Sequence, residues 1–346
     1  MNAKTFEHSL QTLKYPNLDR TLGELKLIST VKVNDGNAHV ELLTVSDDSY
    51  LAVKAVIETA FTHEFKSLNV TKKTQAPKDT NYGHTATPNN RAPYAKNVIA
   101  VTSGKGGVGK STVSVNLAIA LAQKGYRVGI LDADVYGPNI PRLTNTDLEK
   151  IRWNDDNKIV PSENYGLKIM SVALTTPTSD TPLVWRSSVA VSALIQFLED
   201  VAWGELDFMV IDMPPGTGDI QLTMAQELPI TAGVLVTTPQ LVASDDVSRA
   251  IRMFQDIHVP MAGLVENMSY FIAPDTGNRY DIFGSGGGER LAERYNIPLL
   301  GQIPLNMDIR QGSDNGEPPV VLGNDELKSY YKDIVEEMLK AVKFKI

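Results

Sequence analysis

The sequence predicts an α/β protein whose larger part is a doubly wound, mainly parallel sheet with a P-loop NTPase domain, preceded by a small α-β-β-α-β domain. Helical patterns such as 112–124 and 244–257 separate apolar runs, an alternation typical of doubly wound folds. A glycine-rich phosphate-loop motif follows the first run. The runs read as parallel strands buried on both faces: NVIAVTS, RVGILDA, FMVIDMP, TAGVLVTT and MAGLVEN.

Composition sets the limits of the interpretation. The chain has 346 residues, 42% of them hydrophobic, which suggests about two folded domains. Its formal charge of −8 argues against broad nucleic-acid binding, and no apolar run is long enough to span a membrane. The first residues lack the apolar core of a secretory signal, so we expect a cytoplasmic protein. Cysteine is absent, which excludes a disulfide or a thiolate ligand supplied by this chain.

Residues 1–73 predict a compact domain with the element order α-β-β-α-β. Two alternating, β-rich runs flank Asn34-Asp35-Gly36-Asn37, which is a hairpin-type turn. Apolar residues at helical spacing precede and follow these two runs. We therefore expect a helix carrying Phe6, Leu10 and Leu13, strands at 25–33 and 38–45, a helix beginning near 46–49, and a last strand at 66–70.

Residues 74–96 differ in character from the segments on either side. The stretch contains three prolines and almost no aliphatic residues. It cannot bury enough apolar surface to offset the entropy lost on ordering, so we expect a flexible linker. The P-loop domain is expected to occupy residues 97–346.

The phosphate-loop motif G-x-x-x-x-G-K-[ST] runs from Gly104 to Ser111, between a predicted strand and a predicted helix. Glycines let backbone amides converge on phosphate oxygens, and the helix N-terminus adds a positive dipole end. Lys110 would reach the β- and γ-phosphates of ATP, and the Ser111 hydroxyl would bind Mg²⁺. The expected nucleotide-binding residues are Gly104, Lys105, Gly106, Gly107, Val108, Gly109, Lys110, Ser111 and Thr112.

Two neighbouring strands end in carboxylates. Asp132 and Asp134 follow one apolar run, and Asp212 ends another. A single acidic residue at a strand end also serves as a turn former or helix cap, but two such ends beside a phosphate loop favour a magnesium–nucleotide site. We predict Ser111, Asp132 and Asp212 as magnesium ligands, partly through water. Asp134 is predicted to orient the attacking water.

Lys105, two residues before Gly107, resembles the signature lysine of the deviant Walker A motif in the MinD/ParA/nitrogenase-iron-protein superfamily. That resemblance implies a homodimer closed by ATP, in which Lys105 acts catalytically on the phosphates in the partner subunit. A second cation from across an interface would neutralise transition-state charge only in the closed dimer. The alternative for Lys105 is a solvated surface lysine.

Five longer stretches of the chain carry a further resemblance: DADVYGPNIPRL, VIDMPPGTGDIQLT, TTPQLVASDDVSRAI, ENMSYF and YDIFGSGGGERLAERY. They resemble the Mrp family of ATPases, regarded as iron–sulfur cluster carriers. The resemblance covers the chain from residue 97 onward, and residues 1–73 resemble more weakly the iron–sulfur-assembly domain often fused in front of Mrp. It implies ATP and Mg²⁺ as cofactors and places Asn267 near the adenine, with a satisfied loop amide as the alternative.

The sequence departs from that family where Mrp proteins have a C-P-x-C-G stretch. The corresponding residues are Ala273-Pro274-Asp275-Thr276-Gly277, which contain no soft ligand for iron. None of the five histidines, at positions 8, 39, 63, 84 and 258, is placed to substitute. We therefore predict no iron–sulfur ligands on this chain, and a cluster only with ligands from a partner, glutathione or another small thiol.

The leading interpretation is a homodimeric Mg-ATPase of the Mrp type acting in iron–sulfur cluster assembly or transfer. Its expected partners are iron–sulfur assembly factors or apo-protein clients, with no nucleic acid and no membrane. The alternative is a nucleotide-switched positioning or scaffold protein of the MinD/ParA kind with no metal cargo. A ligase of the dethiobiotin-synthetase kind is disfavoured, because nothing marks a small acid substrate. The C-terminal helix has a mixed-charge outer face, typical of a packed surface helix rather than a lipid anchor.

Overall fold

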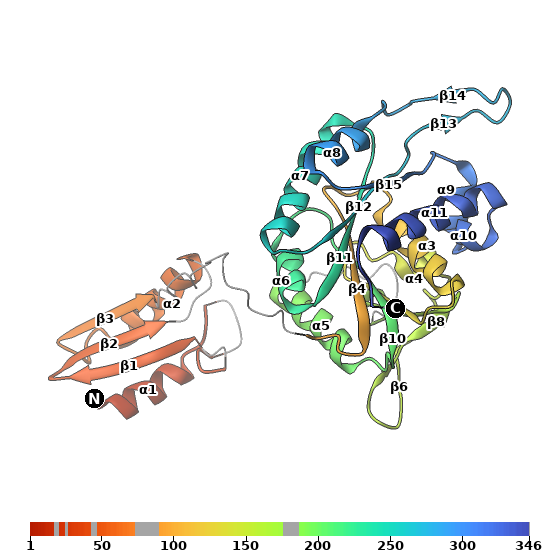
Figure 1. Cartoon of the computed structure of the whole chain (residues 1–346). Helices are drawn as coiled ribbons and strands as arrows, with labels where there is room; N and C mark the ends of the chain where they lie inside the picture. Colours follow the sequence, from red (N-terminus) through yellow and green to blue (C-terminus); the bar gives the residue numbers. More distant parts are fainter. Residues whose placement is uncertain (17–20, 25–26, 43–46, 73–89, 176–186, 346) are drawn as a thin grey trace. The chain divides into compact units, whose positions relative to one another are not determined.

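The computed structural model describes residues 1–16, 21–24, 27–42, 47–72, 90–175 and 187–345. The chain forms two compact units, Met1–His84 and Thr85–Ile346 (Figure 1). The linker predicted at 74–96 falls largely on residues 73–89, outside the described ranges.

The first unit has the predicted order α-β-β-α-β. Its elements are α1 (Ala3–Thr12), β1 (Ile28–Asn34), β2 (Asn37–Leu42), α2 (Asp47–Phe61) and β3 (Ser67–Lys72). β1 and β2 are antiparallel and joined at Asp35 and Gly36, whose φ angles of 50° and 82° are those of a tight hairpin turn. β3 runs parallel to β2. Both helices bury side chains against one sheet face, in a core that includes Phe6, Leu10, Val40, Val53 and Ile57.

The second unit is built on an eight-stranded sheet with the order β15-β12-β11-β4-β10-β5-β9-β8. All neighbours are parallel except β8, which is antiparallel to β9. The order reverses at β4, and such a switch point at the carboxyl ends of strands is where doubly wound sheets bind ligands. The strands are β4 (Ala95–Ser103), β5 (Val128–Asp132), β8 (Ser162–Asn164), β9 (Leu167–Ser171), β10 (Leu206–Asp212), β11 (Ile230–Thr237), β12 (Met261–Glu266) and β15 (Leu299–Gln302).

Helices cover both faces of this sheet, as the apolar runs predict (Figure 1). One face carries α3 (Lys110–Gln123), α4 (Ile140–Leu143), α9 (Met307–Asn315), α10 (Pro319–Leu322) and α11 (Asp325–Ala341). The other carries α5 (Ser187–Asp200), α6 (Asp219–Glu227), α7 (Leu241–Asp256) and α8 (Gly287–Tyr295). Small elements complete the unit: β6 (Arg152–Trp153) with β7 (Ile159–Val160), the 3-10 turn Val172–Thr175, and β13 (Phe271–Ile272) with β14 (Arg279–Tyr280).

The start of the second unit differs from the sequence prediction. β4 begins at Ala95, two residues earlier than predicted. Arg91, assigned to the linker by the sequence, forms ion pairs with Glu227 and Glu199, and Ala92 is fully buried. Residues 91–96 therefore belong to this unit, because a few long-range contacts hold a segment whose own composition indicates no structure.

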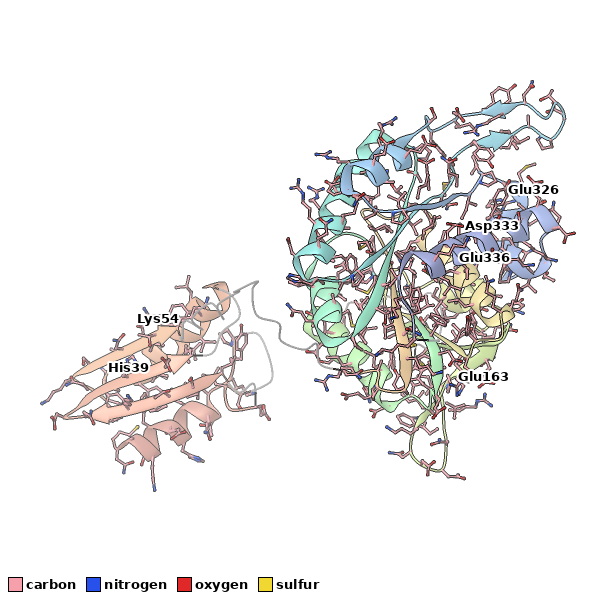
Figure 2. The ribbon with its side chains drawn as sticks, in the orientation of Figure 1. His39, Lys54, Glu163, Glu326, Asp333 and Glu336 are labelled. Carbon is pink, nitrogen blue, oxygen red and sulfur yellow. The ribbon has the colours of Figure 1, made fainter. Side chains whose placement is uncertain are left out.

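The C-terminal helix α11 packs through its apolar stripe. Tyr331, Ile334, Val335 and Met338 are buried against the sheet and α3, as the sequence predicts. Glu326, Asp333 and Glu336 lie along the exposed side of the same helix (Figure 2). Among the described residues, every helix is too short or too polar to cross a bilayer.

Asn97 joins the first strand of the sheet to the end of the chain. Its Nδ2 donates to the backbone carbonyls of Asp207 and Lys345, both at 2.9 Å, and its Oδ1 accepts from the Lys345 amide at 2.8 Å. The Asn97 side chain is fully buried, so each of these bonds replaces water that cannot reach the site.

We expect Asn97→Ala to lower the free energy of unfolding by about 1–3 kcal/mol, because it leaves buried backbone groups unsatisfied. Urea titration of the full chain measures this change. Asn315→Ala, at an exposed position on α9, is the matched control. Equal effects of the two variants would contradict the assignment of Asn97 as a structural tie.

Candidate active site

The phosphate loop lies between the end of β4 and the start of α3, as predicted. Gly106 and Gly107 face open space, since a Cβ atom added to either would meet no atom within 4 Å. Gly109 precedes α3 with a left-handed φ of 82°, a conformation that favours glycine. The loop thus forms an open cradle at the N-terminus of a 14-residue helix, an arrangement that fits a bound phosphate chain.

Lys110 is a buried cation held by two carboxylates. Only 6% of its side chain is exposed, and Nζ lies 2.8 Å from Asp212 Oδ2 and 3.5 Å from Asp134 Oδ2. Burial works to lower the pKa of Lys110, but these carboxylates outweigh it and raise the pKa above the usual lysine value. The amine is therefore charged at neutral pH, and Lys110 lines the cavity beside the glycines.

Asp212, the partner of Lys110 in this ion pair, also accepts hydrogen bonds from two serines of α3. Ser111 donates to its Oδ2 at 2.7 Å, and Ser114 donates to its Oδ1 at 2.6 Å. Ser111 and Ser114 lie one turn apart on α3, so both hydroxyls reach the end of β10. Ser114 was not predicted as a site residue, although its spacing of three residues from Ser111 was a usable signal.

Asp132 lies beside Asp212 in the register of β5 and β10, as strand-end placement predicts. The carboxylate is fully buried and accepts from the amides of Asp134 and Ile140 and from the Ser171 hydroxyl, at 3.0–3.2 Å. Burial raises its pKa to about 8, and the neighbouring Asp212 adds to this rise. In this geometry Asp132 holds the loop after β5; its role as a magnesium ligand stays a prediction.

Of the three strand-end aspartates, Asp134 is the one that lines the cavity. The cavity has a volume of about 310 Å³ and is lined by the phosphate loop together with Asp134. Burial raises the Asp134 pKa, and Lys110 opposes that rise. A carboxylate with a raised pKa at a solvent-accessible position is suited to accept a proton or orient a water molecule.

The far wall of the cavity comes from α4 and α9 and was not predicted. Its residues are Asn139, Arg142, Leu143, Ser313 and Asp314, with Pro215 nearby. The loop that follows β10 is joined to the phosphate loop by the Gly216 amide, which donates to the Ser103 carbonyl at 2.8 Å. No local pattern marks the α4–α9 wall, because two helices from distant parts of the chain supply it.

Lys105 and Asn267 each make a side-chain hydrogen bond near the phosphate loop. Lys105 Nζ donates to Gln240 Oε1, at the start of α7, over 3.1 Å. Asn267 Nδ2 donates to the Val108 carbonyl at 2.9 Å, behind the cradle. The contact of Asn267 matches the satisfied-amide alternative; its predicted place near the adenine is untested and stays a prediction.

A second cavity of about 370 Å³ lies at the opposite edge of the sheet, where β5 and β10 begin. Three of its charged residues have partners, since Arg127 pairs with Glu205 and with the nearby Asp207, and Lys168 donates to the Trp203 carbonyl. It holds no phosphate-loop residue, so the first cavity is the better candidate site.

Residues 273–277, which were predicted to offer no ligand for iron, form a closed turn between β13 and β14. The Ala273 amide donates to the Asn278 carbonyl at 2.9 Å, and the Gly277 amide donates to the Ala273 carbonyl at 2.8 Å. His39 lies in the first unit, 3.3 Å from the Thr71 hydroxyl (Figure 2), and His84 falls outside the described residues. Within the described ranges, no three His, Cys, Asp or Glu side chains form a group that could hold a metal ion.

Comparison with known proteins gives consistent matches. A family model described as ParA, NUBPL iron-transfer P-loop NTPase, matches residues 94–339. The chain is 46% identical over 257 residues to an iron-sulfur cluster carrier protein of Aquifex aeolicus, covering 74% of this chain and 71% of that protein. A protein of the same description from Helicobacter pylori is 39% identical over 322 residues, covering 91% and 85%.

A solved structure extends the comparison to three dimensions. It is a nucleotide-binding protein from Archaeoglobus fulgidus in complex with ADP, 37% identical in sequence. The match has a TM-score of 0.61 and covers 70% of this chain and 94% of the archaeal chain. The mainly parallel α/β fold described above is therefore shared with a protein that binds a nucleotide.

The open space beside Gly106 predicts that Gly106→Ala affects nucleotide binding and stability differently. The added methyl group should occupy the space for phosphate and weaken binding of a slowly hydrolysed Mg-ATP analogue, with little change in thermal stability. A cost of about 1–3 kcal/mol for forcing packed atoms apart corresponds to a roughly 5- to 150-fold loss of affinity. Titration calorimetry measures it, with Gly137→Ala as control, since Gly137 also faces open space but does not line the cavity. Unchanged affinity for Gly106→Ala would contradict the cradle.

Proposed function

The chain belongs to the ParA family, among the NUBPL iron-transfer P-loop NTPases, and on this premise we propose that it is a homodimeric Mg-ATPase acting in iron–sulfur cluster assembly or transfer. The single observation that carries the ATPase proposal is the buried Lys110 between Asp212 and Asp134 beside an open glycine cradle. A polyphosphate is the anion that this combination of helix N-terminus, buried cation and exposed amides fits.

We propose that Lys110 holds the β- and γ-phosphates while Ser111 and Asp212 hold Mg²⁺, the aspartate partly through water. The Ser111 hydroxyl is already 2.7 Å from Asp212, so the two oxygens are close enough to serve one site. Bound magnesium would supply charge neutralisation on the phosphates. Hard oxygen donors of this kind, few in number and completed by phosphate and water, suit Mg²⁺.

Asp134 is the proposed water-orienting residue. It lines the cavity and lies 3.5 Å from Lys110, whereas Asp132 and Asp212 are fully buried behind the loop. Of the three carboxylates, Asp134 is therefore the one that a water beside the terminal phosphate would meet. Its raised pKa favours acceptance of a proton during attack.

Lys105 is proposed to act across a homodimer interface. In the single subunit its Nζ contacts Gln240 and has no contact with the carboxylates around Lys110 among the described residues. Lys105 is half-buried and lines the cavity. Its amine is therefore not engaged by the described aspartates of its own subunit. A partner subunit facing this rim would receive a cation beside its phosphates, which is the kind of group that accelerates phosphoryl transfer.

The cargo proposal rests on the relatives, several of which are described as iron-sulfur cluster carrier proteins. We propose that this chain works with assembly factors or apo-protein clients in the cytoplasm, and that any cluster takes its thiolates from outside the chain. The absence of cysteine specifically favours a second candidate, a nucleotide-switched scaffold or positioning protein of the MinD/ParA kind without metal cargo. The two candidates share the ATPase site and differ in cargo.

The test of the dimeric ATPase is Lys105→Ala. We expect nucleotide affinity to be retained, while ATP hydrolysis falls by about 10³-fold or more, the effect expected on removing a cation supplied in trans. ATP-driven dimer formation, measured by sedimentation, should fall with it. Lys124→Ala is the control, because Lys124 pairs with Glu336 on the surface, away from the cavity. Hydrolysis by Lys105→Ala at the parent rate would contradict the inter-subunit role.

The cargo is tested by restoring soft ligands. Ala273→Cys with Thr276→Cys gives each subunit two thiolates, so two such turns brought together in the proposed homodimer would offer four. This variant should gain a stable cluster on anaerobic reconstitution with iron and sulfide, measured by absorbance and metal analysis. The unaltered chain should hold none without added thiol, because a cluster needs about four thiolates and the chain has no cysteine. Serine at both positions is the matched control, being similar in size but a poor ligand for iron. A stable cluster on the unaltered chain would contradict this prediction.

A further inference from the structure

Glu266, the last residue of β12, is a fully buried carboxylate that the proposed mechanism does not use. Its Oε1 accepts from the Ser269 hydroxyl at 2.5 Å and from Gln302 Nε2 at 3.0 Å. Its Oε2 accepts from the Gly288 amide at 2.5 Å. All three donors are uncharged. A buried carboxylate is tolerated only when its oxygens are hydrogen-bonded, so these contacts fix the surrounding backbone firmly.

Two of these donors flank the β13–β14 hairpin, defined here as residues 270–286. Ser269 immediately precedes the hairpin and Gly288 lies two residues after its end, so Glu266 holds both ends. Within the hairpin, the amides of Ala273 and Gly277 donate the two backbone hydrogen bonds of the turn. The Arg279 guanidinium also stacks on Tyr270, with its central carbon 4.2 Å from the ring centroid. It projects from the body beyond the carboxyl end of β12 (Figure 1). A displacement at Glu266 is thus transmitted to the whole hairpin.

The next residue, Asn267, holds the phosphate loop. It is 7% exposed, and its Nδ2 donates to the Val108 carbonyl at 2.9 Å. The approach is close enough that a Cβ atom added at Gly109 would lie 2.2 Å from Nδ2. The Asn267 amide in turn donates to the Thr237 carbonyl at the end of β11. Adjacent residues therefore hold the phosphate loop and the hairpin.

We propose that the Glu266–Asn267 corner couples nucleotide occupancy of the phosphate loop to the order of the β13–β14 hairpin. The inference rests on the proposed function, because it requires nucleotide to bind at the loop. Phosphate bound to the cradle restricts Val108 and Gly109, and this restricts Asn267 and the adjoining Glu266. Coupling between two sites is reciprocal, so a partner that grips the hairpin changes nucleotide affinity by the same factor.

Hydrogen–deuterium exchange of the full chain tests the coupling, without nucleotide and with saturating Mg-ADP. The amides of Ala273, Gly277 and Gly288 report directly, because each donates one of the hydrogen bonds described above. We expect nucleotide to slow exchange of hairpin peptides by about fivefold or more, the lower end of the usual range for coupled sites. An unchanged hairpin under saturating nucleotide would overturn the inference.

Glu266→Gln tests the role of the Glu266–Asn267 corner. The glutamine amide group is itself a donor, so it cannot accept all three hydrogen bonds that the carboxylate now accepts. We expect this variant to bind Mg-ADP while its hairpin no longer responds. Ser269→Ala, which removes one of the three bonds, carries the same test if Glu266→Gln does not fold. Glu163→Gln, on the exposed edge strand β8 (Figure 2), is the matched control and should keep the parent response. A full response in Glu266→Gln, or in Ser269→Ala when that variant replaces it, would overturn the inference.

Nucleotide affinity, measured on the same samples, distinguishes a failure of the proposed function from a failure of the proposed coupling. A parent chain that fails to bind Mg-ADP contradicts the proposed function and this inference together. A parent chain that binds Mg-ADP with an unresponsive hairpin contradicts this inference alone.

Discussion

The structure of the large unit depends on accommodating one buried charge, the Lys110 ammonium at the start of α3. A cation that is 6% exposed is stable only if carboxylates meet it, and the chain supplies them from the ends of β10 and β5. This requirement fixes the register in which Asp212 lies beside Asp132, and it places α3 so that two serines reach Asp212. Because these carboxylates keep the Lys110 amine charged, the positive charge is in place before an anionic ligand binds.

Much of this site follows from local sequence pattern. The order of strands and helices, the phosphate loop and the strand-end aspartates are each marked by neighbouring residues, and the structure brings Lys110, Asp134 and Asp212 together as predicted. The contacts of Lys105 and Glu266 were not predictable in this way, because Gln240 is 135 residues from Lys105, and Gly288 and Gln302 are 22 and 36 residues from Glu266. Residues 91–96 were misassigned for the same reason, since their structure comes from ion pairs with distant glutamates.

The hairpin keeps an ordered turn although it has no metal ligands. Backbone bonds between Ala273, Gly277 and Asn278 close the turn, so its shape does not depend on a bound cluster. Three large apolar side chains of this segment, Ile272, Tyr280 and Ile282, are about half exposed. The backbone conformation of this segment is therefore held without any soft ligand for iron.

The two outer strands of the large sheet constrain how copies of this chain can associate. β8 has three residues, all polar, and runs antiparallel to its neighbour, while β15 has only four residues. Short or polar border strands offer few unpaired backbone groups, so another sheet cannot extend this one by continuing its ladder. Pairing between edge strands would also be insensitive to a ligand, because no residue of β8 or β15 lines the cavity. Association through the large unit would then use its helices and loops, some of which line the cavity beside the phosphate loop, so a ligand in that cavity could influence it.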